Sequence, residues 1–363
     1  MTRPVLVAPD KFKGTLDAVE AAAAIGRGLL AGGVGEVRLL PVADGGEGTM
    51  EAIVRARGGR ILGAAATDPL GREVGAAFAV LEGGRAAVVE QAQASGLWRL
   101  GAGEREAVAA SSRGTGELIR AAIDAGAREV VVTVGGSATT DGGRGALEAL
   151  GGHFTSRNAD LRELRRTLRG IKLSLACDVR NPMCGPDGAA RTFAPQKGAA
   201  PADVEQLDRR LVAWARLARA TAGRDPAGEP MAGAGGGLAG GLWAFAGAAL
   251  RPGAALVLDT IGFDAAMRES FAVVTGEGSL DRQTLRGKAV FEVATRCRQG
   301  GVPCYALPAV DRLDAFEHRL MNVEVEPAVR NGAVATARDV EQAAQRLGRR
   351  IAPKQPHPSN VPQ

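Results

Sequence analysis

Short apolar runs alternate with amphipathic segments at both ends of this chain. Near the start, Val5 to Ala8 and Val37 to Val42 are predicted to be buried strands, and Leu16 to Leu30 a helix with Thr15 as its N-cap. Near the end, three more runs are predicted to be strands: Ala272 to Val274, Pro303 to Leu307 and Val323 to Pro327. Because strands that alternate with helices favour a parallel sheet, we expect these five segments to form one such sheet.

The middle of the chain has a different pattern. From about Gly59 to Ala94, short alternating runs are separated by the turn sequences Asp68-Pro69-Leu70-Gly71 and Glu82-Gly83-Gly84-Arg85, which favour antiparallel hairpins. Farther along, Asp203 to Ala222 is predicted to be a long amphipathic helix and Leu256 to Leu258 a strand.

These patterns predict an α/β protein with two domains. The first is a discontinuous Rossmann-like (flavodoxin-like) parallel-sheet domain of residues 1–58 and 268–350. The second is an inserted α/β domain of residues 59–267 that contains the antiparallel hairpins. Residues 351–363 are expected to be a disordered tail.

The composition is that of a globular protein, with 45% apolar and 23% charged residues. A net charge of +5 is compatible with nucleic acid binding, but the chain has one tyrosine, and its densest basic run, Arg162 to Lys172, reads as the solvated face of a helix. Four cysteines without CxxC spacing and only three histidines argue against a zinc site. No apolar stretch approaches membrane-spanning length and no signal-peptide hydrophobic region precedes Val5, so we expect a cytoplasmic protein that binds neither nucleic acid nor membrane.

Three apolar runs end in glycine-rich segments that carry carboxylates. The segments are Ala43-Asp44-Gly45-Gly46-Glu47-Gly48-Thr49, Gly135-Gly136-Ser137-Ala138-Thr139-Thr140-Asp141-Gly142-Gly143 and Thr275-Gly276-Glu277-Gly278-Ser279-Leu280-Asp281. Glycine allows backbone N–H groups to turn onto an anion, a following helix N-terminus adds a favourable dipole, and carboxylate oxygens suit Mg²⁺. A kinase acting on a small acid is therefore the first candidate function.

Lysine is rare in this chain and lies mostly in motif-like stretches. Only six of the 45 lysine and arginine residues are lysine, and Lys11, Lys13, Lys197 and Lys288 lie close to glycine. The lysine ammonium is a compact, mobile charge that can follow a phosphoryl group better than the planar guanidinium of arginine. The other two, Lys172 and Lys354, are expected to be surface residues.

Eight motifs follow one another in a characteristic order. They are Ala8-Pro9-Asp10 with Phe12-Lys13, Pro41 to Thr49, Gly114-Thr115-Gly116-Glu117-Leu118-Ile119, Gly135 to Thr139, Ala176-Cys177-Asp178-Val179 with Asn181-Pro182, Pro195-Gln196-Lys197-Gly198-Ala199, Gly233 to Gly237, and Thr275 to Gly278 with Asp281, Gln283, Thr284, Gly287 and Lys288. In combination, from Val5 to about Leu307, they resemble the bacterial glycerate kinases of the type-I family (glycerate 2-kinases).

The resemblance implies a phosphotransferase with an alcohol group as acceptor. Enzymes of this family phosphorylate D-glycerate with ATP, mostly to 2-phosphoglycerate, so ATP and Mg²⁺ are the cofactors it implies. Its fold, a discontinuous Rossmann-like domain with a second α/β domain, agrees with the outline above. The nucleotide preference and the oligomeric state stay open, a homodimer included.

The motifs supply candidates for the chemistry. Asp44 is the first candidate for the residue beside the glycerate hydroxyl and Asp178 the second, although either could cap the turn that follows it. Lys13 and Lys288 are candidate cations for the transferred phosphoryl group or the glycerate carboxylate.

Metal and phosphate binding have separate candidates. Glu277 with Asp281 is the candidate Mg²⁺ site, and Gly135 to Thr139 form the candidate anion nest. All candidate residues for binding the substrate or the nucleotide are Asp10, Gly45, Gly46, Gly135, Gly136, Ser137, Ala138, Thr139, Gln196, Lys197, Gly276, Gly278 and Thr284.

The chain departs from the family pattern at a few positions outside the acidic and lysine residues. Pro308-Ala309 stands where the family usually has Ala-Gly-Ser, which leaves the backbone contacts of that loop open. Asp68 replaces the usual glycine before Pro69.

Other functions remain to be weighed. A dinucleotide-dependent oxidoreductase would suit a Rossmann-like sheet, but no GxGxxG follows the first strand, which ends in Pro9-Asp10-Lys11. A kinase of another small hydroxy acid, or a non-catalytic protein that binds a small acid, would use similar loops. The lysines and the three acidic glycine-rich loops are more than a protein needs to bind a carboxylate alone, which argues against the non-catalytic alternative.

Overall fold

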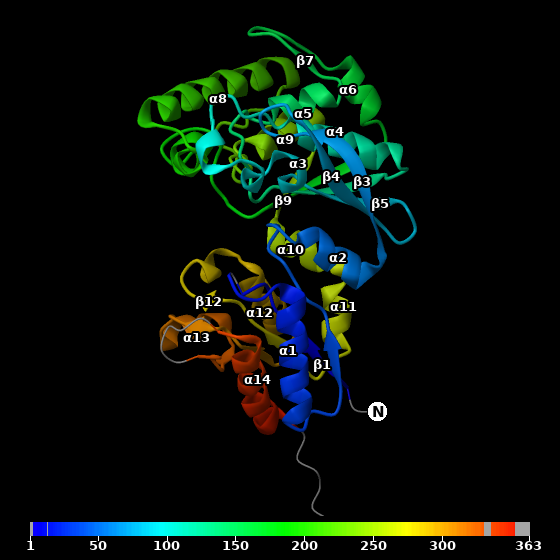
Figure 1. The fold of residues 1–363 in the computed structure, drawn as a ribbon, viewed down its shortest axis with the longest axis vertical. Helices are drawn as coiled ribbons and strands as arrows, with labels where there is room; N and C mark the ends of the chain where they lie inside the picture. The colour runs from blue at the N-terminus through cyan, green and yellow to red at the C-terminus, as the bar shows by residue number, and fades with distance from the viewer. Residues whose placement is uncertain (1–2, 13, 330–334, 353–363) are drawn as a thin grey trace, which may run out of the picture. The chain divides into compact units, whose positions relative to one another are not determined.

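The computed structural model of the protein describes residues 3–12, 14–329 and 335–352 (Figure 1). The chain divides into two compact units, the first of residues 1–43 with 262–363 and the second of residues 44–261. Both combine helices with strands, which confirms the predicted α/β class. The predicted domain boundaries stay a prediction. Lys13 and residues 353–363, which hold most of the predicted tail, lie outside the described residues.

The first unit alternates strands and helices. Its strands are β1 (Val5–Val7), β2 (Val37–Leu39), β11 (Ala272–Thr275), β12 (Ser279–Leu280), β13 (Cys304–Ala306), β14 (Val310–Asp311) and β15 (Glu324–Val325). Its helices are α1 (Ala18–Ala31), α11 (Phe263–Arg268), the 3₁₀ helix η4 (Thr284–Arg286), α12 (Ala289–Gly300), α13 (Ala315–Met321) and α14 (Ala337–Ile351).

The main sheet of this unit is parallel throughout, in the order β15-β13-β11-β1-β2. Its strands lie within or overlap the five segments predicted from the apolar runs, so the prediction of a parallel sheet is confirmed. Helices α1 and α14 lie side by side (Figure 1) and pack with Val5, Val7 and Val274 in one core. Gly28 of α1 permits this close packing, because a Cβ there would collide with the Glu341 carbonyl oxygen.

The start of α1 differs from the prediction. Its N-cap is Asp17, not Thr15, because the Asp17 carboxylate accepts hydrogen bonds from Val19 N and Glu20 N at 2.8 and 2.7 Å. The Glu20 carboxylate accepts in return from Asp17 N and completes a capping box. Thr15 instead donates its hydroxyl to the Phe12 carbonyl oxygen in the preceding turn.

The second unit is larger. Its strands are β3 (Gly59–Thr67), β4 (Glu73–Leu81), β5 (Ala86–Glu90), β6 (Glu129–Thr133), β7 (His153–Phe154), β8 (Ala159–Asp160), β9 (Lys172–Cys177) and β10 (Ala249–Pro252). Its α-helices are α2 (Thr49–Arg57), α3 (Ala92–Ser95), α4 (Arg113–Asp124), α5 (Arg144–Ala149), α6 (Arg162–Thr167), α7 (Ala189–Phe193), α8 (Pro201–Ala222), α9 (Leu238–Ala246) and α10 (Gly253–Ile261), and its 3₁₀ helices are η1 (Leu97–Arg99), η2 (Ala102–Glu104) and η3 (Pro195–Lys197).

One mixed sheet organises this unit, in the order β10-β9-β6-β5-β4-β3. β3, β4 and β5 form the two antiparallel hairpins that the turn sequences predict, whereas β5, β6, β9 and β10 run parallel. Asp68 holds the first hairpin turn, because its carboxylate accepts from Leu70 N and Arg72 N, both at 2.9 Å. The aspartate that departs from the family pattern is thus an integral part of its turn.

Two predicted elements are wrong. Leu256 to Leu258 belong to helix α10, not to a strand, since a short buried apolar run has no periodicity that separates the two forms. Arg162 to Lys172 are helical only as far as Thr167, and Lys172 begins strand β9. Over the described ranges, no helix combines the length and the apolar content needed to cross a bilayer.

Candidate active site

The carboxyl ends of three neighbouring strands meet in the second unit. β5, β6 and β9 are adjacent and parallel, so the segments that follow them emerge at one edge of the sheet. The segment after Asp44 approaches the same edge, because a Cβ on Gly135 would lie 2.8 Å from Gly46 Cα and 3.5 Å from Asp178 Oδ2. The structure therefore brings together Gly45, Gly46, Gly135 and Asp178 of the predicted residues.

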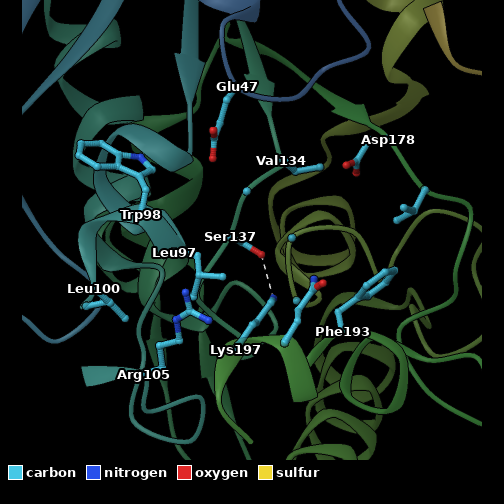
Figure 2. A pocket seen from close by; sticks show the side chains of 16 residues that line it. Glu47, Leu97, Trp98, Leu100, Arg105, Val134, Ser137, Asp178, Phe193 and Lys197 are labelled. Atoms are coloured by element: carbon cyan, nitrogen blue, oxygen red, sulfur yellow. Dashed lines mark hydrogen bonds between the residues drawn. The ribbon is translucent and has the colours of Figure 1, made fainter. Parts of the chain in front are cut away.

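A cavity of about 560 Å³ opens at this edge (Figure 2). The cations of Arg105 and Lys197 occupy one part of its wall, and the carboxylates of Glu47 and Asp178 occupy another. The rest of the lining is largely apolar or glycine: Leu97, Trp98, Leu100, Val134, Gly135, Gly136, Ser137, Val179, Phe193, Gln196, Gly235 and Gly236.

The predicted anion nest forms one wall of this cavity. Gly136 has a φ of +71°, and a Cβ there would meet Glu47 Oε1 at 2.5 Å, so this position requires glycine. The nest is hydrogen-bonded to the end of α3 and the start of η1, since Ala138 N donates to Ser95 O and Leu97 N donates to Gly136 O, both at 2.9 Å. The following helix, α5, begins only after the Gly142-Gly143 turn, so the nest itself is not a helix N-terminus.

Lys197 is buried against the same loop, with 2% of its surface exposed. Its ammonium donates to Ser137 Oγ at 2.8 Å and to the Thr139 carbonyl oxygen at 2.6 Å. Burial lowers the pKa of Lys197 to about 7, against the opposing influence of the Asp141 and Asp178 charges. A phosphate beside this ammonium would favour its charged form, which makes the site suited to an anion.

Several residues that line the cavity were not predicted from the sequence. Arg105, Trp98 and Phe193 stand in no glycine-rich motif, and no sequence signal distinguishes them from surface or core residues. Gly198 supplies part of the geometry, because it has a φ of +95° and a Cβ there would meet the Cβ of Arg105 at 2.8 Å. The glycine after Lys197 thus allows Arg105 to lie close to the lysine motif.

The two candidate aspartates have different surroundings. Asp178 is exposed and lines the cavity. The Asp44 carboxylate accepts a hydrogen bond from Gly46 N at 3.1 Å, the local turn contact that a capping role requires. Asp44 is half-buried and is not part of the cavity lining.

Other predicted residues form a second group, in the first unit. Glu277 Oε1 accepts a hydrogen bond from Thr284 Oγ1 at 2.6 Å, and Glu277 Oε2 lies 3.8 Å from Lys288 Nζ. Asp281 N donates to Thr284 Oγ1 at 3.2 Å, so Thr284 connects the two carboxylate residues. The third glycine-rich segment therefore places a cation, a hydroxyl and two carboxylate residues close together.

The backbone on both sides holds this third segment. Asp10 N donates to Gly276 O and Ala309 N donates to Glu277 O, both at 2.9 Å, while Val310 N donates to Gly278 O at 3.2 Å. The Pro308-Ala309 loop, which departs from the family pattern, thus makes backbone contacts with the segment that carries Glu277.

The carboxylates of this group are enough in number for a Mg²⁺ ion that is also bound by phosphates. Among the described side chains, no three or more His, Cys, Asp or Glu residues are arranged to hold a metal ion. Mg²⁺ bound together with phosphates needs only one or two carboxylates. Glu277 and Asp281, linked through Thr284, provide two sets of hard oxygen atoms and fit that requirement.

Glu90, the last residue of β5, is a buried carboxylate with 2% of its surface exposed. Its Oε1 accepts a hydrogen bond from Met50 N, in the first turn of α2, at 2.8 Å. Burial raises the pKa of Glu90 to about 7, opposed by the Met50 hydrogen bond and reinforced by the Glu51 charge. Glu90 therefore holds the helix that follows the Asp44 segment.

The raised pKa of Glu90 predicts a pH-dependent stability. The folded state binds the proton of the Glu90 carboxyl more tightly than the unfolded state does. The contribution of this proton to the stability of the fold is therefore full below pH about 4.5 and is lost as the pH rises through about 7. Glu90→Gln keeps the acceptor for Met50 N without the charge. We expect the stability of the variant relative to that of the natural protein, measured by urea denaturation, to be higher at pH 8 than at pH 5. An equal stability difference at both pH values would contradict the prediction.

Comparison with known proteins places these groups in context. The profile described as "Glycerate kinase family" matches residues 5–352. The chain belongs to the glycerate kinase family. It is 38% identical over 362 residues to the glycerate kinase of Bacillus subtilis, covering 95% of each chain, and 38% identical over 307 residues to glycerate 2-kinase of Escherichia coli, covering 80% and 81%.

A crystal structure extends the comparison to the fold. A protein assigned as glycerate kinase 2 from Salmonella typhimurium LT2 has 32% sequence identity and a TM-score of 0.82, with 97% of this chain and 98% of that chain covered. These comparisons confirm the family predicted from the motifs and the prediction of a kinase of the glycerate kinase class.

Proposed function

We propose that this protein transfers the γ-phosphoryl group of ATP to D-glycerate and forms 2-phosphoglycerate and ADP. Membership of the glycerate kinase family supports the reaction class. The observation that carries the proposal is the cavity of the second unit, where a buried lysine and a glycine-rich loop share a pocket with two carboxylates (Figure 2). Phosphates suit the cationic part, and a hydroxyl group that loses its proton suits the carboxylates.

The cationic part of the cavity binds the anionic groups in this proposal. The loop from Gly135 to Thr139 holds the ATP phosphates through its backbone, with Lys197 as the adjacent cation and Gln196 beside it. Arg105, whose planar guanidinium can hold a carboxylate with two hydrogen bonds, binds the carboxylate of glycerate. Gly45 and Gly46 lie against the nest, since a Cβ on Gly135 would be 2.8 Å from Gly46 Cα and 3.4 Å from Gly45 O.

Asp178 is the proposed acceptor of the glycerate hydroxyl proton, because it lines the cavity. Asp44, which the motifs favour, is the alternative, since its segment reaches the same edge of the sheet. Phosphoryl transfer needs little covalent help from the enzyme, so positioning the hydroxyl group would be the larger part of either residue's role.

The group in the first unit supplies charge to the transferred phosphoryl group. Lys288 is the mobile cation, and Lys13 has the same proposed role from the motif alone. Glu277 and Asp281 would hold Mg²⁺, which neutralises phosphate charge when bound. Thr284 fixes the orientation of the Glu277 carboxylate.

We also propose that the first unit is Rossmann-like. Counted along the chain, its strands lie in the order 2-1-3-4-5, which is the flavodoxin-like arrangement. In such sheets ligands bind beyond the carboxyl ends of the strands, where the segments of Asp10 and Glu277 lie. A cytoplasmic location accords with this metabolic chemistry.

The test is an ADP-release assay with purified protein, ATP and Mg²⁺. We expect turnover with D-glycerate and much slower turnover with L-glycerate, glycolate and lactate. Phosphorus and proton NMR of the product should show the phosphate on the C2 oxygen. Absence of ADP release with D-glycerate would reject the reaction, and a phosphate on the C3 oxygen would reject only the proposed product.

A further inference from the structure

We propose that Trp98 is a stacking platform for the adenine base of ATP, an inference that rests on the proposed function. The cavity of about 560 Å³ is much larger than a three-carbon acid requires, and phosphates would occupy only its nest and cationic part. Leu97, Trp98 and Leu100 line another part of the cavity wall (Figure 2).

The exposure of Trp98 points to a ligand. It is 58% exposed even though its ring is large and apolar, and it lines the same cavity as the nest. An exposed aromatic ring in a concave site offers contact area for a flat apolar partner at low entropic cost. A purine base is such a partner, because it presents a π-face to any aromatic ring.

The indole is already fixed in place. Its Nε1 donates to the Ala92 carbonyl oxygen at 2.8 Å, and the Arg99 guanidinium lies 4.5 Å from the ring centroid. Arg99 is itself held, because its Nε donates to Gln93 O at 2.6 Å and its Nη2 to Gly75 O at 2.8 Å. A ring with so little freedom to lose is preorganised for stacking.

The residues beside Trp98 are also paired through their backbone with the loop proposed to bind the phosphates. Gly96 and Ser137 form a β-bridge, and Leu97 N donates to Gly136 O at 2.9 Å. The residues next to Trp98 are thus hydrogen-bonded to the residues of the nest. A nucleotide with its phosphates on the nest would therefore meet a ring whose position the same loop sets.

The test separates the base from the phosphates. Isothermal titration with Mg²⁺ compares the non-hydrolysable analogue AMP-PNP, which has a base, with tripolyphosphate, which has none. Trp98→Ala should weaken AMP-PNP binding by about tenfold to a hundredfold and leave the affinity for tripolyphosphate unchanged. Trp98→Phe, which keeps an aromatic face, should restore most of the AMP-PNP affinity.

Trp243 is the matched control. Arg224 lies 4.2 Å from its ring centroid, as Arg99 does for Trp98, but Trp243 does not line the cavity. Trp243→Ala should leave both affinities unchanged. Tripolyphosphate binding in Trp98→Ala confirms that the nest is folded, so undiminished AMP-PNP affinity, or an equal loss for both compounds, would overturn the inference. The proposed function is judged separately by ADP release from the natural enzyme.

Discussion

Lys288→Met is expected to lower kcat by about two orders of magnitude or more, because a cation on the transferred phosphoryl group acts mainly in the transition state. Lys288 Nζ lies 3.8 Å from Glu277 Oε2 at the end of a side chain that is only 30% exposed. Methionine keeps much of the length of the chain and removes the charge. The melting temperature should change little, since an ion pair at this distance contributes little to stability.

Lys172→Met is the control for this substitution. Lys172 is exposed at the start of β9, and the hydrogen bond that it makes to Arg128 O uses its backbone N–H, which the substitution keeps. Both variants are measured in the ADP-release assay at saturating ATP and D-glycerate, with thermal unfolding as the stability measurement. Near-normal turnover of Lys288→Met would remove Lys288 from the site.

The fold was predictable where buried strands appear in the sequence as runs of consecutive apolar residues. Strands β1 and β11 are covered on both faces, so they appear as continuous apolar runs, and the alternation of strands with helices at both ends of the chain predicts a parallel sheet. The same burial misleads at Leu256 to Leu258, because three consecutive buried residues of a helix give the same short apolar run as a buried strand. The start of α1 required the choice between Thr15 and Asp17, which depends on the Glu20 contact.

The candidate site was predictable only where a local motif carries the chemistry. The glycines stand out because they cluster at strand ends, and Lys197 stands out because lysine is rare in this chain. The positive φ of Gly136 shows why the nest needs glycine at that position. Arg105 and Trp98 enter the cavity through long-range contacts of their neighbours, such as Leu97 N with Gly136 O. Such contacts depend on tertiary packing and leave no periodic pattern in the sequence.

Asp178→Asn should lower kcat by about a hundredfold or more, since the amide cannot accept the proton of the glycerate hydroxyl. Asp44→Asn should have a much smaller effect, because the asparagine side-chain oxygen can still accept the hydrogen bond from Gly46 N at the turn. Each substitution is isosteric, so the melting temperature of both variants should stay close to that of the natural protein.

The two variants show which of Asp178 and Asp44 accepts the proton and which only caps a turn. The measurements are kcat and kcat/KM for D-glycerate across pH, with thermal unfolding of each variant. Loss of turnover together with loss of the acid limb of the pH profile in Asp178→Asn would identify it as the residue that accepts the proton. If Asp178→Asn keeps most of its turnover while Asp44→Asn loses it, the role passes to Asp44, and the Gly46 contact would then orient a reacting carboxylate rather than cap a turn.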